Sequence, residues 1–203
     1  MTELRWAEDG SDRAVADYLA ARIGAGARRI ALPGGKTPIG ILDLLAQADL
    51  PWADLTLALV DDRMVPPDHP ASNFGLLSRA LAGKPVQIEP LAEGPCSGGR
   101  FDLVWLGMGA DGHIASIFPG SGPGPDLPAA VVRTVPDPLP PEAPFARLTM
   151  TYAALTDTDE IVLVVRGEAK RAVLQGVIAG QSNLPIARLL AAATSPVTIF
   201  WTA

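Results

Sequence analysis

The chain has 203 residues, 48% of them hydrophobic, and a formal net charge of −6. This length and apolar content predict a single domain over residues 1–203 with one sizeable core. The excess of acidic side chains argues against an extended nucleic-acid surface, so any anionic ligand must be held by a local positive site.

The N-terminal stretch and the cysteine content bear on where the protein works. Residues 1–13 lack the basic and apolar regions of a signal peptide, and no apolar run approaches the roughly 18 residues that a membrane helix needs. The single cysteine, Cys96, excludes an internal disulfide. We therefore expect a cytoplasmic protein with neither a membrane nor a nucleic acid as its partner. The sequence does not specify an oligomeric state.

The first part of the chain alternates short strands with helices. Residues 3–7 are expected to form an edge strand, and Ser11 then caps a helix whose apolar residues recur at helical spacing. Residues 29–32 read as a second strand, and another amphipathic helix follows from about Pro38 onward. The glycine-rich turn at residues 33–38 therefore sits between a strand and a helix.

That turn, PGGKTP, has the chemistry of a phosphate-binding site. Gly34 and Gly35 let the backbone N–H groups at a helix start approach an anion closely. Thr37 adds a hydroxyl donor, and Lys36 adds positive charge. The alternative is an ordinary turn that places Pro38 at the first helical position. We favour the first interpretation, in which the turn binds substrate.

A second polar cluster follows the buried strand predicted at residues 55–60. Asp61 and Arg63 lie at its carboxyl end. The forked donors of Arg63 suit phosphate oxygens, although an arginine between acids is often a salt-bridged loop residue. Ser72 and Asn73 then start a short helix, where Asn73 either caps the helix or contacts a ligand.

The strongest candidate for chemistry is the stretch from residue 101 to 121, FDLVWLGMGADGHIASIFPGS. Its apolar run reads as a buried strand, and Gly107 and Gly109 then allow the backbone to approach a ligand. Asp111 and His113 come next, beyond the strand's carboxyl end, which is where open α/β sheets bind ligands.

Three interpretations compete for this stretch. Its G-x-G-x-x-G spacing matches a dinucleotide-binding loop, but Pro119 and Gly120 interrupt the long helix that should follow. Imidazole and carboxylate also bind zinc, but the chain has two histidines and no H-x-x-x-H or C-x-x-C pair. We favour a general base, His113, whose ring the Asp111 carboxylate orients. We therefore predict neither a metal nor a cofactor.

The last part of the chain adds two basic candidates. A strand predicted at residues 145–151 carries Arg147, and a buried strand at residues 160–165 leads through Gly167 into a helix. Lys170 lies in the first turn of that helix, where a cation opposes the helix dipole unless it faces an anion held there. Further elements are expected as strands at residues 131–135 and 197–201 and as a helix at residues 184–193.

Four separated segments resemble the 6-phosphogluconolactonase family. They are residues 34–38 (GGKTP), 61–66 (DDRMVP), 72–73 (SN) and 106–119 (LGMGADGHIASIFP). Glucosamine-6-phosphate deaminases share a similar glycine loop and D-G-H, but this chain keeps the lactonase continuation. The resemblance covers almost the whole chain. It implies an α/β fold with a mainly parallel central sheet and helices on both faces, a Rossmann-like layered architecture.

The resemblance also implies an activity and a partner. The activity is hydrolysis of 6-phosphoglucono-1,5-lactone, a small phosphosugar lactone, in the pentose phosphate pathway and without metal or cofactor. His113 would be the general base of the family. In the mechanism that we expect, His113 activates water, Asp111 supports it, and backbone N–H groups of the 107–112 loop stabilise the oxyanion. The candidate substrate contacts are Gly34, Gly35, Lys36, Thr37, Asp61, Arg63, Asn73, Gly107, Gly109, Arg147 and Lys170.

Three features depart from the family pattern, and two other functions compete. Lys36 stands where the family usually has Ser, Asp62 where it usually has Glu, and the terminal residues 201–203 lack an acidic side chain often found there. One rival function is sugar-phosphate isomerisation with deamination, in which Asp61 would shuttle the proton. The other is a sugar-phosphate sensor that binds without turnover.

Overall fold

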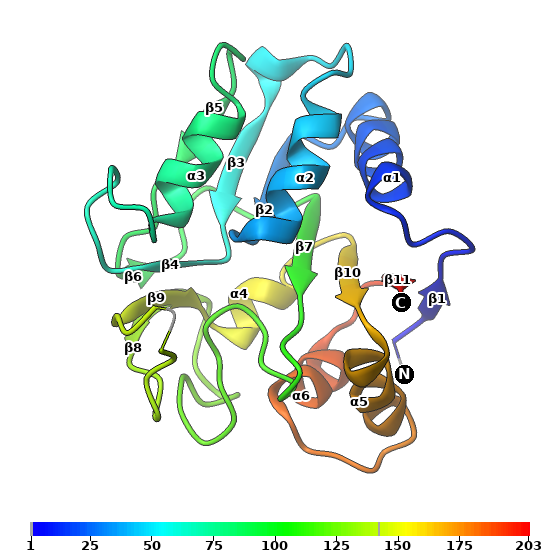
Figure 1. The fold of residues 1–203 in the computed structure, drawn as a ribbon, viewed down its shortest axis with the longest axis vertical. Helices are drawn as coiled ribbons and strands as arrows, with labels where there is room; N and C mark the ends of the chain where they lie inside the picture. Colours follow the sequence, from blue (N-terminus) through cyan, green and yellow to red (C-terminus); the bar gives the residue numbers. More distant parts are fainter. Residues whose placement is uncertain (1, 142) are drawn as a thin grey trace.

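The computed structural model describes residues 2–141 and 143–203 and is built around a parallel sheet (Figure 1). Within these residues the sheet has seven strands in the order β1-β11-β10-β7-β2-β3-β5, and each neighbouring pair is parallel. The strands are β1 (Leu4–Trp6), β2 (Arg29–Leu32), β3 (Thr56–Leu59), β5 (Gln87–Glu89), β7 (Leu103–Gly107), β10 (Ile161–Arg166) and β11 (Val197–Thr202). The predicted mainly parallel central sheet is confirmed.

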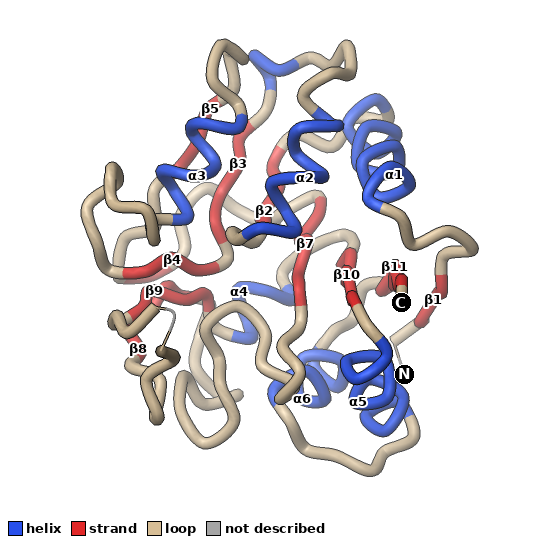
Figure 2. Tube along the Cα trace, viewed as in Figure 1, coloured by secondary structure: helices blue, strands red, loops and turns tan. Residues whose placement is uncertain are grey.

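Helices cover both faces of this sheet, as Figures 1 and 2 show. One face carries α1 (Asp12–Gly24), α2 (Lys36–Leu45) and α3 (Asn73–Ala80), and the other carries α4 (Tyr152–Thr156), α5 (Glu168–Ile178) and α6 (Pro185–Ala192). Because side chains alternate along a strand, β7 packs Trp105 with the first group of helices and Leu106 with the second. Each face therefore has its own apolar core. Within the described residues no helix is both long and apolar enough to span a membrane.

The helices α1 and α3 begin with a side-chain cap, whereas α2 and α5 begin after a glycine. Ser11 and Ser72 cap α1 and α3, and each hydroxyl accepts a hydrogen bond from an N–H group of the first turn. α2 and α5 instead follow Gly35 and Gly167, whose φ angles of 103° and 88° favour glycine. Among the described residues no side chain caps either start. First-turn N–H groups of α2 and α5 are therefore left for a ligand.

A second sheet is antiparallel, with the order β4-β9-β8-β6 in the described part of the chain. Its strands are β4 (Asp61–Arg63), β6 (Gly94–Pro95), β8 (Ala130–Thr134) and β9 (Arg147–Met150). The sequence places D-D-R only at the carboxyl end of the preceding strand, and these residues have low strand propensity. Pairing with β9 makes it a strand, with Arg63 opposite Arg147 and Asp61 opposite Thr149. The pairing fixes Asp61 and Arg63 on one element directly after β3.

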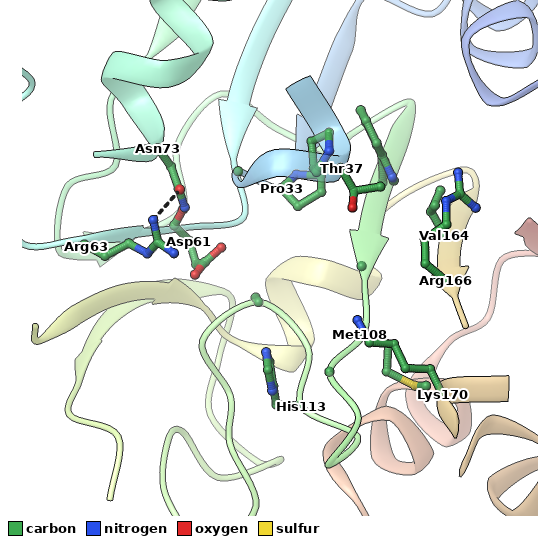
Figure 3. A pocket seen from close by; sticks show the side chains of 16 residues that line it. Pro33, Thr37, Asp61, Arg63, Asn73, Met108, His113, Val164, Arg166 and Lys170 are labelled. Carbon is green, nitrogen blue, oxygen red and sulfur yellow. Dashed lines mark hydrogen bonds between the residues drawn. The ribbon is translucent and has the colours of Figure 1, made fainter. Parts of the chain in front are cut away.

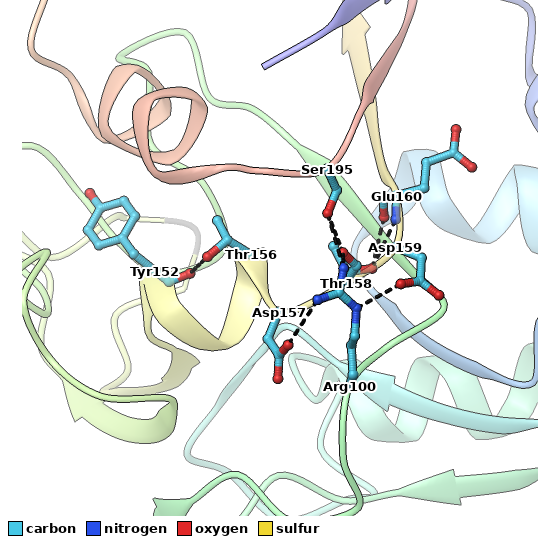
Figure 4. A network of polar contacts seen from close by, with 8 residues as sticks. All are labelled: Arg100, Tyr152, Thr156, Asp157, Thr158, Asp159, Glu160 and Ser195. Carbon is cyan, nitrogen blue, oxygen red and sulfur yellow. Dashed lines mark hydrogen bonds and ion pairs between the residues drawn. The ribbon is translucent and has the colours of Figure 1, made fainter. Parts of the chain in front are cut away.

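A network around Arg100 ties the amino ends of three parallel strands together (Figure 4). Its guanidinium donates to Asp159 at 2.7 Å, to Ser195 at 3.4 Å and to the carbonyl of Thr158. These residues lie just before β7, β10 and β11. Structural contacts thus occupy the amino ends of these strands, while the carboxyl ends remain available for a ligand.

Candidate active site

A cavity of about 300 Å³ lies at the carboxyl ends of the parallel strands (Figure 3). Most of the predicted site residues line it: Gly34, Thr37, Asp61, Arg63, Asn73, Gly107, Gly109, His113 and Lys170. Segments from β2, β4, α3, β7 and α5 therefore converge on one space, although they are far apart in the sequence. Parallel topology explains this convergence, because it brings the carboxyl ends of neighbouring strands to one edge of the sheet.

His113 and Asp111 form a close pair. Nδ1 of His113 lies 2.6 Å from Oδ1 of Asp111, and the His113 side chain is 32% exposed. A carboxylate at this distance selects the tautomer in which Nδ1 carries the proton, which leaves the lone pair on Nε2. Among the described residues Nε2 has no hydrogen-bond partner. The pair is therefore arranged to accept a proton at the cavity.

The pKa of Asp111 is lowered by its contacts with His113. Partial burial alone would raise the pKa of this carboxyl. The backbone N–H of His113, which donates to Oδ1 at 3.2 Å, and the ring of His113 outweigh burial and lower the pKa. Asp111 therefore stays ionised and can stabilise an imidazolium on His113.

Two glycines of the cavity make room for neighbouring protein side chains. A Cβ on Gly109 would stand 2.2 Å from Nδ1 of His113, and one on Gly34 would stand 2.0 Å from Cγ of Asn73. The N–H of Gly109 donates to the carbonyl of His113 at 2.9 Å, and the N–H of Gly112 donates to Gly109 at 3.1 Å. These two N–H groups are engaged within the loop, so they are not the oxyanion donors that we expected from the 107–112 loop.

Asp61 is held at the cavity by the loop that carries His113. Its Oδ2 accepts the hydroxyl of Ser116 at 2.5 Å, and the N–H of Ser116 donates to Oγ1 of Thr149 at 3.2 Å. Burial raises the pKa of Asp61, although Ser116, Arg63 and Arg147 oppose the shift. The carboxyl therefore holds a proton more readily than an exposed aspartate does.

A tight turn brings Ser116 back toward Asp61. Ile114 and Ile117 pair across it, with N–H to carbonyl distances of 2.8 and 3.4 Å. Ala115 occupies the left-handed region with a φ of 46°, a conformation that costs a residue with a Cβ about 1–2 kcal/mol. Ala115 also lines the cavity. Backbone strain therefore accompanies the placement of His113 and Asp61 at one cavity.

Arg63 and Asn73 are linked beside Asp61. Nη1 of Arg63 donates to Oδ1 of Asn73 at 3.0 Å, the bond drawn in Figure 3, and to the carbonyl of Ala71 at 2.8 Å. The Asn73 amide donates to the carbonyl of Asp61 at 3.0 Å. Asn73 thus orients the guanidinium as well as lining the cavity. Ser72, rather than Asn73, caps α3.

Asp62, where the family usually has Glu, has a structural role. Its carboxylate accepts the N–H groups of Asn73 at 2.6 Å and of Phe74 at 3.0 Å. It therefore stabilises the positive end of α3 and fixes the start of that helix beside β4. Asp62 is 9% exposed and does not line the cavity.

The other end of the cavity gathers positive charge. Thr37 lines it from the start of α2, Lys170 from the first turn of α5, and Arg166 from the end of β10. Figure 3 shows Lys170 reaching from α5 toward the strand ends. The uncapped N–H groups of α2 and α5 add partial positive charge. This end has the chemistry of an anion site.

Some predicted residues lie outside the cavity wall. Asp111 contacts His113 but does not line the cavity, and Gly35 lines an adjoining apolar hollow. Arg147 is 4% exposed, and its Nη2 donates to the carbonyl of Ala143 at 2.9 Å. Burial and the nearby Arg63 lower its pKa. The predicted substrate contacts of Gly35 and Arg147 stay predictions. The side chain of Lys36 lies outside the part of the chain that the structure describes.

Sequence reasoning missed Arg166, Trp105 and Ser116. Arg166 ends a buried strand, which is the same signal that singled out Asp61. Trp105 belongs to an apolar run in the sequence, although its indole N–H is polar. For Ser116 the sequence offers no comparable signal, because its role depends on the turn that places it on Asp61.

Metal ligands do not gather in the described residues: no group of three or more His, Cys, Asp or Glu side chains there could hold an ion. In the cavity wall, Asp61 and His113 are the described residues whose side chains commonly bind metals. The absence of a metal requirement stays a prediction.

Comparison with known proteins confirms the resemblance. A family model described as glucosamine-6-phosphate isomerases/6-phosphogluconolactonase matches residues 6–201. A 6-phosphogluconolactonase of Pseudomonas putida is 37% identical over 210 residues, which cover 92% of this chain and 85% of that protein. One from Caulobacter vibrioides is 38% identical over 193 residues, covering 84% and 82%. The crystal structure of a 6-phosphogluconolactonase from Shewanella baltica, 26% identical, gives a TM-score of 0.79 over 100% of this chain and 98% of that one. The chain therefore belongs to the glucosamine-6-phosphate isomerase/6-phosphogluconolactonase family.

Proposed function

We propose that the protein is a 6-phosphogluconolactonase, which hydrolyses 6-phospho-D-glucono-1,5-lactone to 6-phospho-D-gluconate. The observation that carries the mechanism is the His113–Asp111 pair at 2.6 Å, in which His113 lines a cavity whose far end gathers cations. The relatives named above support the choice of substrate and the class of reaction, a lactone hydrolase. We propose that residues 1–203 act as one lactonase domain in the cytoplasm, with neither nucleic acid nor membrane as partner.

Substrate binding uses the two ends of the cavity differently. The phosphate dianion lies at the end lined by Thr37 and Lys170, near the uncapped start of α2. The lactone ring then extends toward His113, and its C1 carbonyl lies within reach of Nε2 through one water molecule. Holding the phosphate fixes the position of the carbonyl, which removes much of the entropy cost of reaction.

The chemical steps need one group that takes a proton and later returns it. Nε2 of His113 removes a proton from water as the oxygen attacks C1, and the carbonyl becomes an oxyanion. Asp111 stabilises the imidazolium. The intermediate collapses by breaking the bond between C1 and the ring oxygen, which takes the proton back from His113. The product is an open-chain acid, and a positioned base contributes about 10²–10⁴-fold.

Asp61 is the basis of the second candidate function. It lines the same cavity, and its raised pKa suits a group that carries a proton. In an isomerase or deaminase this carboxylate would move a proton between neighbouring sugar carbons. In the lactonase that we propose, Asp61 and Arg63 form the polar wall opposite the anion end. A sensor without turnover has no specific observation in its favour.

A rapid assay tests the proposal. Freshly generated 6-phosphogluconolactone is mixed with the protein, and acid release is followed with the spontaneous opening subtracted. We expect enzymatic hydrolysis well above that background and no ammonia release from glucosamine 6-phosphate. Ammonia release without lactone hydrolysis would favour the deaminase. Binding of 6-phosphogluconate with neither activity would identify a sensor.

A further inference from the structure

The cavity wall includes two residues to which the proposed mechanism gives no role, Trp105 and Arg166. β7 and β10 are parallel neighbours, with Trp105 opposite Val162 and Gly107 opposite Val164. Because side chains alternate, Trp105 and Arg166 lie on the same face of the sheet, the face covered by α1 and α2. Both line the cavity.

Trp105 has an unpartnered donor at this wall. Its side chain is 1% exposed, and no acceptor among the described residues takes the indole Nε1–H. Buried donors are nearly always paired in folded proteins, so an orphan at a cavity wall indicates a ligand that supplies the acceptor. The nitrogen itself is buried, so a ligand oxygen reaches it only if neighbouring side chains of this wall rearrange when the ligand binds.

An ion pair with an acidic residue of α1 fixes the orientation of the Arg166 side chain. Its Nη2 donates to Oδ1 of Asp12 at 2.6 Å, and its Nη1 makes a long bond of 3.4 Å to the carbonyl of Val165. A guanidinium has five N–H groups, so donors remain for the cavity. The side chain is 22% exposed while Asp12 is 45% exposed. Asp12 therefore holds Arg166 in place from the more solvent-exposed side.

Arg166 and Lys170 both line the cavity near the start of α5. They are four residues apart across the start of α5, whose first turn has no side-chain cap among the described residues. A cation at the positive end of a helix is unfavourable unless an anion lies there. A dianion balances this charge better than a neutral sugar does.

We propose that Arg166 and Trp105 form a second wall of the phosphate site, where Arg166 binds one phosphate oxygen and the indole N–H of Trp105 donates to another. This inference rests on the proposed function and deepens it, because it makes these two residues determinants of the preference for phosphorylated lactones. Asp12 is a positioning residue for Arg166.

The test measures binding, so it does not depend on turnover. Calorimetry with 6-phosphogluconate, inorganic phosphate and gluconate is carried out on the wild type, Arg166→Met, Trp105→Phe and the control Arg13→Met. Arg13 lies on α1 with a 72% exposed side chain in a surface ion pair, so its loss should change little. We expect Arg166→Met to weaken 6-phosphogluconate binding about 10-fold or more, and Trp105→Phe about 2–10-fold. Gluconate binding should change less than about twofold, because it carries no phosphate.

A second readout follows the indole directly. We expect 6-phosphogluconate to change the tryptophan fluorescence of the wild type, and Trp105→Phe to abolish the change, although three other tryptophans remain in the chain. If Arg166→Met does not fold, Arg166→Lys replaces it, with an expected several-fold loss because lysine lacks the forked donors.

Wild-type affinity for 6-phosphogluconate in Arg166→Met, or in Arg166→Lys if it is the folded variant, would overturn the role of Arg166, and the same result in Trp105→Phe would overturn that of Trp105. Equal losses for gluconate and 6-phosphogluconate would also overturn the phosphate assignment. A wild type that binds 6-phosphogluconate through these residues but does not hydrolyse the lactone would contradict the proposed function and support this inference.

Discussion

Gly109 lies directly against the imidazole of His113: a Cβ at this position would come within 2.2 Å of Nδ1 and 2.5 Å of Oδ1 of Asp111. The sequence suggested that this glycine lets the backbone approach a ligand. In the structure Gly109 also makes room for the His113–Asp111 pair, which fills the space that a side chain at this position would occupy. Even the methyl group of an alanine at residue 109 would therefore disturb the His113–Asp111 pair, without contacting the substrate.

The first prediction concerns Gly109→Ala. The new methyl group must push the His113 ring away from Asp111, so we expect kcat to fall at least about tenfold, part of the contribution of a general base. Unfolding temperature should change little, because the ring is partly exposed and can rotate. The matched control is Gly124→Ala, where a Cβ meets nothing within 4 Å. Wild-type kcat in Gly109→Ala would show that the observed pair geometry is not needed for turnover.

The second prediction separates the two members of the pair. His113→Asn should keep the fold and the affinity for 6-phosphogluconate but lower turnover by about 10² or more. Asp111→Asn should be milder if orientation is its main role, since the amide oxygen still accepts from Nδ1–H. A loss nearly as large would mean that the charge on Asp111 is needed to stabilise imidazolium. Near-normal hydrolysis in His113→Asn, together with an inactive Asp61→Asn, would transfer the role of base to Asp61.

The parallel sheet could be predicted because its strands are short apolar runs, each followed by a polar cluster. The strand predicted at residues 55–60 is observed as β3, Thr56–Leu59, and the apolar run before the glycines forms β7, Leu103–Gly107. Burial on both faces makes such strands read as continuous hydrophobic segments. The residues that follow them then converge at one edge for topological reasons.

The strand β4 and the role of Ser116 depend on tertiary contacts. β4 is a strand only because β9 pairs with it, and Ser116 reaches Asp61 only through the turn at Ala115. Local propensity carries no information about either contact. The burial of Arg147 could not be predicted either. A basic residue in a strand is usually expected at the surface, but Arg147 is only 4% exposed.

The third prediction is that activity needs no metal ion. The motivation is that no group of three or more metal-binding side chains gathers in the described residues. Exhaustive treatment with a chelator, followed by removal of the chelate, should leave the rate of lactone hydrolysis unchanged. Recovery of a lost rate by one particular divalent ion would instead assign that ion a catalytic role.

The last prediction uses the raised pKa of Asp61, which follows from burial against the opposing effects of Ser116, Arg63 and Arg147. A carboxyl whose pKa is higher in the folded state binds more protons there than in the unfolded state, so it lowers stability as pH rises from its unfolded pKa of about 3.9 through its folded pKa. Asp61→Asn cannot titrate and lacks this contribution. We therefore expect the unfolding free energy of the wild type, minus that of Asp61→Asn, to fall as pH rises above about 4. Urea unfolding of both proteins from acid to neutral pH measures the difference, and Asp17→Asn, on the exposed face of α1, is the control. A difference that grows with pH would mean that the positive charges around Asp61 outweigh its burial.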